Sequence, residues 1–333
     1  MSTDPDPRST GMPEGPWLTV LGMHRSGTSA VTGVLGGFGF ATPQAADRMH
    51  WPESNPEHWE SSSLTVYNDG VLAALGGSWD APPDFAPGWQ NRITVRSDPH
   101  PAELARRAFP DPGPVAWKDP RLCLLLPYWQ RILPPPHAFV FIWRRPLRVA
   151  DSLRRRDGMH LADGVALWER YNRSALEHLA GSDTYVCSYE SLVTDPARSV
   201  GALADWLRSL PQFAGHAIAE DPERAVDAVT DEHPVEPPDP GGLLLEQHHE
   251  LVSRLVGLEG AHHPLGTTVL ASESPWTTAL LTDRRGSRTR ELEGLELQLH
   301  QRQLTIDHLH ASLSWRVTAP LRTIVGRFRG VRA

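Results

Sequence analysis

The sequence is poor in the residues that build disulfide frameworks and membrane spans. It has two cysteines in 333 residues, and because Cys123 and Cys187 both lie in apolar runs we expect buried free thiols and no disulfide. No run of about eighteen apolar residues occurs, which argues against a membrane-spanning helix. Residues 1–16 are polar and proline-rich, lack the apolar core of a signal peptide, and are predicted to be disordered. These absences favour a cytoplasmic protein.

Lysine is nearly absent as well. Lys118 is the only lysine, against 31 arginines, and the formal net charge is −8. Ten of the arginines and four acidic residues lie in residues 284–333, so the tail is basic and the rest of the chain is acidic. An acidic body argues against general nucleic-acid binding, but it is compatible with one pocket for an anionic ligand. The histidine pairs at 248–249 and 262–263 have no ligand-like partners at useful spacing, so we expect no metal site.

One stretch near the N-terminus has the pattern of a phosphate-binding turn. Residues 17–21 predict a buried strand, and a glycine-bounded turn that opens a helix follows, here called the cradle: Gly22-Met23-His24-Arg25-Ser26-Gly27-Thr28-Ser29. Backbone N–H groups at such a turn bind polyanions. Thr28 stands where a Walker A loop has lysine, which weakens a nucleotide-hydrolysing interpretation, and Arg25 supplies the cradle's cation. The alternative interpretation is a tight turn without a ligand.

A second group of basic and hydroxyl residues follows an apolar strand predicted over residues 137–143. That strand ends at Arg144, and a helix predicted over residues 147–156 places Ser152 and Arg156 four residues apart on one face. Two guanidinium groups and a hydroxyl suit a phosphate monoester. The alternative is that the arginines of this helix form a solvated face.

The alternation of strands and helices predicts an α/β fold. Strands are expected at 17–21, 114–118, 137–143 and 184–188, with helical patterns between them, as in a three-layer sandwich with a mostly parallel central sheet. Lys118 lies at the carboxyl end of the second strand, where ligands of parallel sheets bind. The predicted main domain spans residues 17–283, followed by a helical extension over 284–333.

The extension contains two further patterns. Leucine and isoleucine recur at a/d spacing between Leu292 and Leu313, interrupted by Arg302, which predicts either a coiled-coil homodimer or packing against the main domain. Residues 315–333 combine five arginines with apolar residues and no acid. This basic amphipathic pattern predicts either contact with an anionic membrane, at the inner face of the cell membrane, or a frayed tail.

Four separated stretches together resemble one family, the sulfotransferases that use 3′-phosphoadenosine 5′-phosphosulfate (PAPS). They resemble most its bacterial branch, which is related to the tyrosylprotein sulfotransferases and has arginine in the cradle. The stretches lie between about residues 17 and 210 and are the cradle, Lys118-Asp119-Pro120, Arg144-x-Pro146 with Ser152, and Tyr189-Glu190-Ser191-Leu192 with Asp195-Pro196. Their common order and spacing make the signal specific, whereas each alone is weak.

The resemblance implies a P-loop-type fold and assigns roles to residues. It implies that the 5′-phosphosulfate of PAPS is bound by Arg25, Ser26, Gly27, Thr28 and Ser29. It implies that Arg144 and Ser152, with Arg156, bind the 3′-phosphate, and that Tyr189 has a cofactor-contacting or structural role. The family has Asp or Asn after the 3′-phosphate arginine, whereas this chain has Arg145, so either arginine is a candidate for that contact.

The expected reaction is transfer of a sulfuryl group from PAPS to a hydroxyl, without a metal. Arg25 and Lys118 are expected to stabilise the charge that develops during transfer. The family carries a catalytic carboxylate after the cradle helix, which makes Glu60 the expected base, with Glu57 and His58 as alternatives. The tail motif Ser312-Leu313-Ser314-Trp315-Arg316-Val317-Thr318-Ala319-Pro320-Leu321-Arg322 resembles tails of bacterial glycan-modifying enzymes, and this resemblance favours a glycan or glycolipid acceptor. Two other functions remain open at this point, a P-loop kinase or NTPase and a non-catalytic scaffold.

Overall fold

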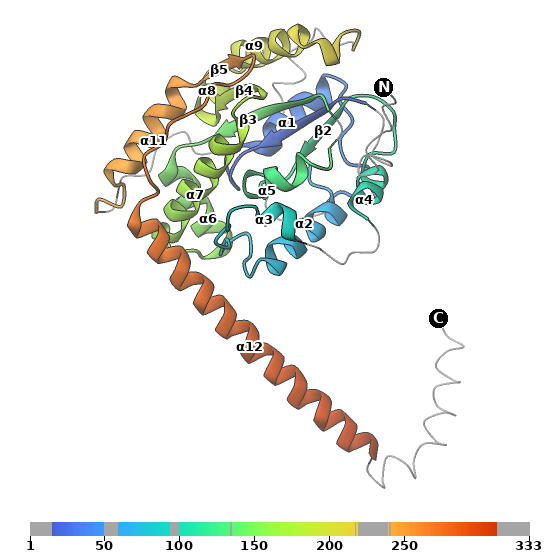
Figure 1. Ribbon diagram of the computed structural model, residues 1–333, viewed down its shortest axis with the longest axis vertical. Coiled ribbons are helices and arrows are strands. Elements are labelled where there is room, and N and C mark those ends of the chain that lie inside the picture. The colour runs from blue at the N-terminus through green and yellow to red at the C-terminus, as the bar shows by residue number, and fades with distance from the viewer. Residues whose placement is uncertain are drawn as a thin grey trace. The chain divides into compact units, whose positions relative to one another are not determined.

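A single five-stranded sheet organises the part of the chain that the computed structural model describes, which is residues 15–49, 59–93, 100–133, 135–216, 218, 239 and 241–311. The strands lie in the order β2-β1-β3-β4-β5 (Figure 1). Their bounds are β1 (Trp17–Leu21), β2 (Val115–Lys118), β3 (His137–Trp143), β4 (Asp183–Ser188) and β5 (Gly260–His262). The first four strands pair in parallel, and β5 is antiparallel to β4.

The sheet is covered on both faces because its central strands β1 and β3 are apolar at nearly every position. Alternate side chains of a strand point to opposite faces, so the odd-numbered residues of β1, such as Trp17, enter one apolar cluster and the even-numbered ones, such as Leu18, enter another. The first face packs against helices α2 (Ser62–Ala74), α4 (Pro101–Ala108), α5 (Leu122–Trp129), α6 (Pro146–Asp157), α7 (Leu161–Leu179) and α11 (Glu246–Gly257). The second packs against α1 (Thr28–Gly37), α8 (Tyr189–Thr194) and α9 (Pro196–Ser209). The prediction of a three-layer α/β sandwich with a mostly parallel sheet is confirmed.

The strand order brings the candidate site residues to one edge of the sheet. From β1 the chain passes to β2 on one side and then to β3 on the other side of β1, so the order reverses there. The cradle follows β1, Lys118 ends β2, and Arg144 follows β3. Because parallel strands end at the same edge, these segments meet at the carboxyl ends of the sheet, where α/β proteins bind ligands.

The described structure also contains elements that were not expected. Strand β5 was not predicted, nor were the short helices α3 (Trp89–Arg92) and η1 (Pro211–Phe213). The C-terminal part forms one helix, α12 (Pro275–Ala311), which begins well before the predicted heptads. The C-terminal helical extension is therefore present.

Contacts divide the chain into two compact units, Met1–Thr282 and Asp283–Ala333. Within the second unit, α12 exposes six large apolar side chains. Leu292, Leu295, Leu299 and Ile306 follow the predicted heptad spacing, whereas Leu297 and Leu304 lie off that helical face. The predicted coiled coil stays a prediction, and the predicted membrane-contact segment 315–333 lies outside the described residues. Among the described helices, none is long and apolar enough to cross a membrane.

Candidate active site

The cradle is a tight turn held by backbone bonds. The N–H of Ser26 donates to the carbonyl of Met23 at 3.0 Å. Arg25 and Gly27 both adopt left-handed backbone conformations, with φ of 69° and 93°. A non-glycine residue in this region is uncommon and is held there by its surroundings, as at many functional sites. Gly27 is also the N-cap of α1 and has no side chain to accept from the first helical N–H groups, which can therefore bind an anion.

The two glycines of the cradle are required by close neighbours. A Cβ atom on Gly22 would lie 2.4 Å from the carbonyl oxygen of Ile142 in β3. A Cβ atom on Gly27 would lie 2.2 Å from the ring of Tyr189, in addition to the strain of its positive φ. The cradle is thus packed directly against the end of β3 and the start of α8.

Four residues predicted to bind PAPS meet at the cradle. The Arg25 Nε–H donates to Ser152 Oγ on α6 at 2.8 Å. Arg144 donates from Nη1 to the Arg25 carbonyl oxygen at 3.4 Å, and its guanidinium carbon lies 4.4 Å from the centre of the Tyr189 ring. Arg25, Ser152, Arg144 and Tyr189 come from four separate segments, so the fold places both predicted phosphate sites side by side.

Positive charge is concentrated at this point. Burial, and then the neighbouring charges of Arg156 and Arg144, lowers the pKa of Arg25 from its usual value. Arginine remains charged under all ordinary conditions, so the lowered pKa reflects first the burial of the Arg25 charge and then its repulsion by Arg156 and Arg144. An anion bound among them would relieve that repulsion.

The structure distinguishes the two arginines that follow β3. Arg144 contacts the cradle and Tyr189, whereas Arg145 is the exposed N-cap of α6 and its backbone N–H donates to Glu190 at 3.2 Å. The geometry therefore favours Arg144 for the 3′-phosphate contact. Arg156 forms an ion pair with Asp157 at 2.8 Å and lies over the Trp79 ring at 5.5 Å.

Ser26 and Thr28 are buried within the cradle. The Ser26 hydroxyl is fully buried and has no hydrogen-bond partner among the described residues. A buried polar atom without a partner costs free energy, which a ligand oxygen at the cradle would recover. Thr28, the first residue of α1, is 4% exposed, and its carbonyl accepts from the Thr32 hydroxyl at 2.8 Å.

The predicted base and the single lysine form a buried ion pair. Lys118 and Glu60 are 2% and 6% exposed, and the Lys118 ammonium group donates to a Glu60 carboxylate oxygen. The same ammonium donates to Ser29 Oγ of the cradle at 3.2 Å. Glu60 is therefore linked to the cradle through Lys118. The alternative bases Glu57 and His58 lie outside the described residues.

Arg121 is a site residue that sequence analysis missed. Its Nη1 lies 3.8 Å from Glu60 Oε2 and 3.1 Å from Asp119, and its Nε lies 2.6 Å from Asp69 on α2. Although burial opposes the charged form, Asp119 and Asp69 raise the pKa of Arg121. The guanidinium thus positions the carboxylate of Glu60. Arg121 directly follows the Lys118-Asp119-Pro120 motif, and this position was the sequence signal that could have identified it.

His24 is a second missed residue. It is 6% exposed, and its ring centre lies 4.5 Å from that of Trp79 and 5.9 Å from that of Tyr171 on α7. Burial, and then the charge of Arg121, holds the pKa of His24 well below its usual value, so the ring is neutral at physiological pH. His24 Nε2 has no hydrogen-bond partner among the described residues. Its position beside Arg25 in the cradle was the signal that could have identified it.

The described residues contain no group of three or more histidine, cysteine, aspartate or glutamate side chains that could hold a metal ion. Of the histidines considered for metal binding, His248 accepts from the Leu245 N–H through Nδ1 and donates from Nε2 to the buried carboxylate of Glu169 at 3.1 Å. His262 contacts the carbonyl of Leu258 at 2.8 Å.

Comparisons with known proteins give only distant similarities. No family model and no curated protein matches the chain. Among solved structures, the chain is similar to the sulfotransferase domain of the Synechococcus PCC 7002 olefin synthase, with 17% identity, 83% of this chain and 96% of that chain covered, and a TM-score of 0.38. The sulfotransferase domain of the curacin biosynthetic pathway is 13% identical, with 84% of this chain and 98% of that chain covered and a TM-score of 0.38. Retinol dehydratase in complex with androsterone and the inactive cofactor PAP is 14% identical, with 85% of this chain and 82% of that chain covered and a TM-score of 0.32. Neither the identities nor the TM-scores suffice to assign the chain to a family.

Proposed function

We propose that the protein is a sulfotransferase that moves a sulfuryl group from PAPS to a hydroxyl group and releases adenosine 3′,5′-bisphosphate (PAP). The observation that carries the proposal is the meeting of four motifs at one sheet edge. There the cradle contacts Ser152 through Arg25, Tyr189 through Gly27, and the Glu60–Lys118 pair through Ser29. An anion site enclosed by these contacts, with a carboxylate beside it, suits group transfer between an anionic donor and a hydroxyl.

The residues present fit both phosphate groups of PAPS. The unpartnered Ser26 hydroxyl, the uncapped start of α1 and Arg25 suit the 5′-phosphosulfate. Arg144 and Ser152 suit the 3′-phosphate, and Arg156 adds positive charge nearby. Arg25 donates to Ser152, so in the proposed complex it would lie between the two anionic groups.

In the transfer step, the acceptor oxygen forms a bond to sulfur as the bond between sulfur and the phosphate oxygen breaks. Glu60 would take the acceptor proton, which neutralises its carboxylate and weakens its ion pair with Lys118. The ammonium group would then be available to the negative charge that grows on the leaving phosphate. Such preorganised donors supply about 3–4 kcal/mol each, and a positioned base contributes about 10²- to 10⁴-fold.

The acceptor and partners form the finer part of the proposal. We place the chain near the bacterial branch related to tyrosylprotein sulfotransferases, with a glycan or glycolipid acceptor and no metal. The exposure of Leu292, Leu295, Leu299 and Ile306 at heptad spacing on α12 supports self-association through Leu292–Leu313 as a coiled-coil homodimer. Sedimentation of the full chain measures this oligomeric state, and Leu292→Glu and Leu299→Glu should shift a dimer to a monomer.

Residues 315–333 would add peripheral contact with the inner membrane face.

Replacement of the cradle cation tests the function. Arg25→Ala removes the guanidinium between the two anion sites, so transfer from radiolabelled PAPS to a crude glycolipid and polysaccharide fraction should fall by about 10²- to 10³-fold. The matched control is Arg198→Ala in α9, an exposed arginine whose replacement should leave transfer unchanged. Unchanged transfer in Arg25→Ala would retire the assignment. Hydrolysis of ATP that depends on Mg²⁺ would instead favour an NTPase.

A further inference from the structure

His24 of the cradle is held in place by two aromatic side chains. Its buried ring packs against Trp79, with 4.5 Å between ring centres, and against Tyr171 on α7, with 5.9 Å between ring centres. The Tyr171 hydroxyl donates to the Trp79 carbonyl at 2.7 Å, so the two aromatic residues also hold each other. The Nε2 atom of His24 is buried, yet it has no hydrogen-bond partner in the part of the chain that the structure describes. A hydrogen bond to a ligand would recover the free energy that an unpaired buried nitrogen costs.

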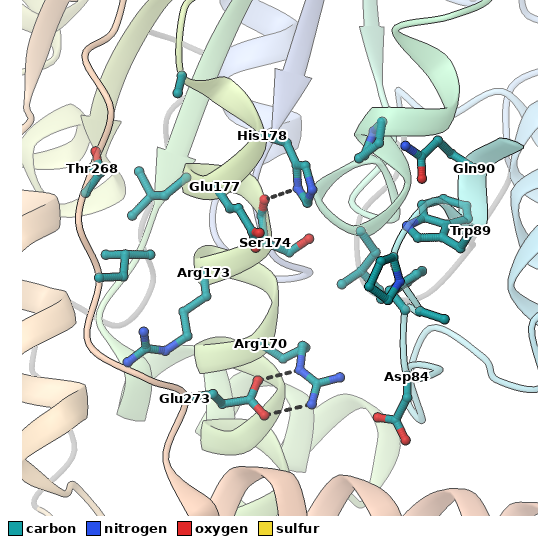
Figure 2. Close-up of a pocket in the computed structure, with 18 of the residues that line it drawn as sticks. Asp84, Trp89, Gln90, Arg170, Arg173, Ser174, Glu177, His178, Thr268 and Glu273 are labelled. Carbon is teal, nitrogen blue, oxygen red and sulfur yellow. Dashed lines mark hydrogen bonds and ion pairs between the residues drawn. The ribbon is translucent and has the colours of Figure 1, made fainter.

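Two other histidines show the contacts that a structural role produces. His248 is buried, and both of its ring nitrogens bond protein atoms, Nε2 the carboxylate of Glu169 at 3.1 Å. His178 bonds the Ser174 carbonyl through Nδ1 at 2.7 Å and lines a cavity beside α7 (Figure 2). His24 is buried like His248, but its buried nitrogen is not paired in this way. A purely structural role therefore leaves the polar atom of His24 unexplained.

Positive charge surrounds the His24 ring. After burial, the largest causes that lower the pKa of His24 are the charges of Arg121, Arg156, Lys118 and Arg25, in that order. These side chains come from the residue before α5, the end of α6, the end of β2 and the cradle. A neutral imidazole has one N–H group, which can donate to a negatively charged oxygen without adding a further cation. An anionic oxygen is therefore the partner that best suits His24.

The same cations place His24 near the proposed base. Lys118 pairs with Glu60, and Arg121 lies 3.8 Å from Glu60 Oε2. Both charges act on the His24 ring, and Lys118 also donates to Ser29 of the cradle at 3.2 Å. In the proposed reaction the sulfuryl group passes from a phosphate at the cradle to a hydroxyl beside Glu60. Its oxygens would therefore lie where His24 and these cations converge.

We propose that His24 donates a hydrogen bond from Nε2 to an oxygen of the sulfuryl group, both in bound PAPS and during transfer. This inference rests on the proposed function, because it assigns a contact to the group that PAPS carries and PAP lacks. His24 keeps its proton throughout. The acceptor proton goes to Glu60, the bond between sulfur and the phosphate oxygen breaks, and PAP leaves. Because Trp79 and Tyr171 fix the ring, the donor is preorganised for the transfer step.

The affinities for PAPS and PAP test this contact, because the two nucleotides differ by the sulfuryl group. Isothermal titration calorimetry of the full-length protein, without acceptor, measures both. His24→Leu removes the donor but keeps an apolar side chain against Trp79. Its affinity for PAPS should fall about 10- to 100-fold, as expected for the loss of a hydrogen bond to a charged group, and its affinity for PAP should stay within about twofold of the wild type.

Two amide variants test which ring nitrogen acts. The amide nitrogen in His24→Gln reaches about as far as Nε2, whereas that in His24→Asn reaches only about as far as Nδ1. His24→Gln should therefore retain most of the PAPS affinity, and His24→Asn should lose as much as His24→Leu. The matched control is His178→Asn, about 10 Å beyond Tyr171 along α7 and in the cavity of Figure 2. This control should bind both nucleotides as the wild type does.

The outcomes separate this inference from the proposed function. Loss of PAPS affinity alone in His24→Leu, with recovery in His24→Gln, supports both. If His24→Leu weakens PAPS and PAP equally, or neither, the sulfuryl contact is overturned, while PAP binding by the wild type still supports a sulfotransferase. If His24→Leu does not fold, the amide variants decide, and equal PAPS affinity of His24→Gln and His24→Asn would overturn the contact. If the wild type binds neither nucleotide, the proposed function fails and this inference fails with it.

Discussion

Two buried polar clusters in this protein differ in how completely their polar atoms are paired. The first surrounds Glu169 of α7, which is 0% exposed. Its carboxylate accepts from Arg173 at 2.8 Å, from the N–H and hydroxyl of Ser274 at 3.0 and 2.8 Å, and from the Thr277 hydroxyl at 2.6 Å, with His248 Nε2 at 3.1 Å. This cluster joins α7 to α11 and to the start of α12 within the first unit.

The second cluster lies at the cradle. It contains the Glu60–Lys118 pair, but the Ser26 hydroxyl and His24 Nε2 have no hydrogen-bond partner among the described residues. Polar groups that remain unpaired in a folded interior lower stability, whereas the fully paired Glu169 cluster stabilises it. This difference agrees with the proposal that the cradle cluster binds a ligand, whereas the Glu169 cluster stabilises the fold.

The largest expected effect separates the two carboxylates by activity. Glu60→Gln keeps the size of the side chain but removes the proton acceptor, so sulfate transfer should fall by about 10²- to 10⁴-fold. Transfer per folded molecule in Glu169→Gln should match the wild type. Single-turnover transfer from radiolabelled PAPS measures both variants. Equal loss in the two would show that both clusters serve catalysis.

The two carboxylates should differ in the opposite way in their effect on stability, where Glu169 matters more than Glu60. Glu169→Gln replaces a charged acceptor with an amide that cannot accept from all its present donors, so the free energy of unfolding should fall by about 2–4 kcal/mol. Denaturant unfolding in the absence of nucleotide measures this. A change below about 0.5 kcal/mol would contradict the structural role of the cluster.

Acid should weaken the Glu169 cluster selectively. Although burial opposes ionisation, the hydrogen bonds from His248, Thr277 and Ser274 hold the pKa of Glu169 well below its usual range. A carboxyl with a lowered folded-state pKa contributes stability above its unfolded pKa, about 4.3, and loses it as the pH falls below that value. The stability gap between wild type and Glu169→Gln should therefore be constant from pH 7 to 5 and narrow toward pH 3. If the stability difference between wild type and Glu169→Gln does not change with pH, ionisation of Glu169 is not its cause.

The parts of the fold that local sequence patterns define were predicted. Strands β1 and β3 are apolar at nearly every position, which is typical of strands buried on both faces. The helices between the strands have apolar residues at helical spacing. Strand β5 is three residues long and has no pattern of its own, so its pairing with β4 depends on tertiary contacts. The start of α12 at Pro275 was missed because the heptad pattern begins later.

The candidate site divides in the same way. The cradle and Lys118 stand out in the sequence, and the family resemblance suggested Glu60. The roles of Arg121 and His24 depend on partners far away in the chain. Arg121 pairs with Asp69, 52 residues earlier, and His24 packs against Trp79 and Tyr171. No local pattern reports such pairs, because only the completed sheet brings them together.

The most direct test of the central claim compares two nucleotides. PAP has the 5′-phosphate and the 3′-phosphate that the cradle, Arg144 and Ser152 are proposed to hold, whereas ATP with Mg²⁺ lacks the 3′-phosphate. Thermal unfolding of the full-length protein should therefore be shifted upward by PAP, with a gain of about 2.7 kcal/mol at a hundredfold excess over its Kd, and not by ATP with Mg²⁺. Stabilisation by ATP with Mg²⁺ but not by PAP would contradict the account.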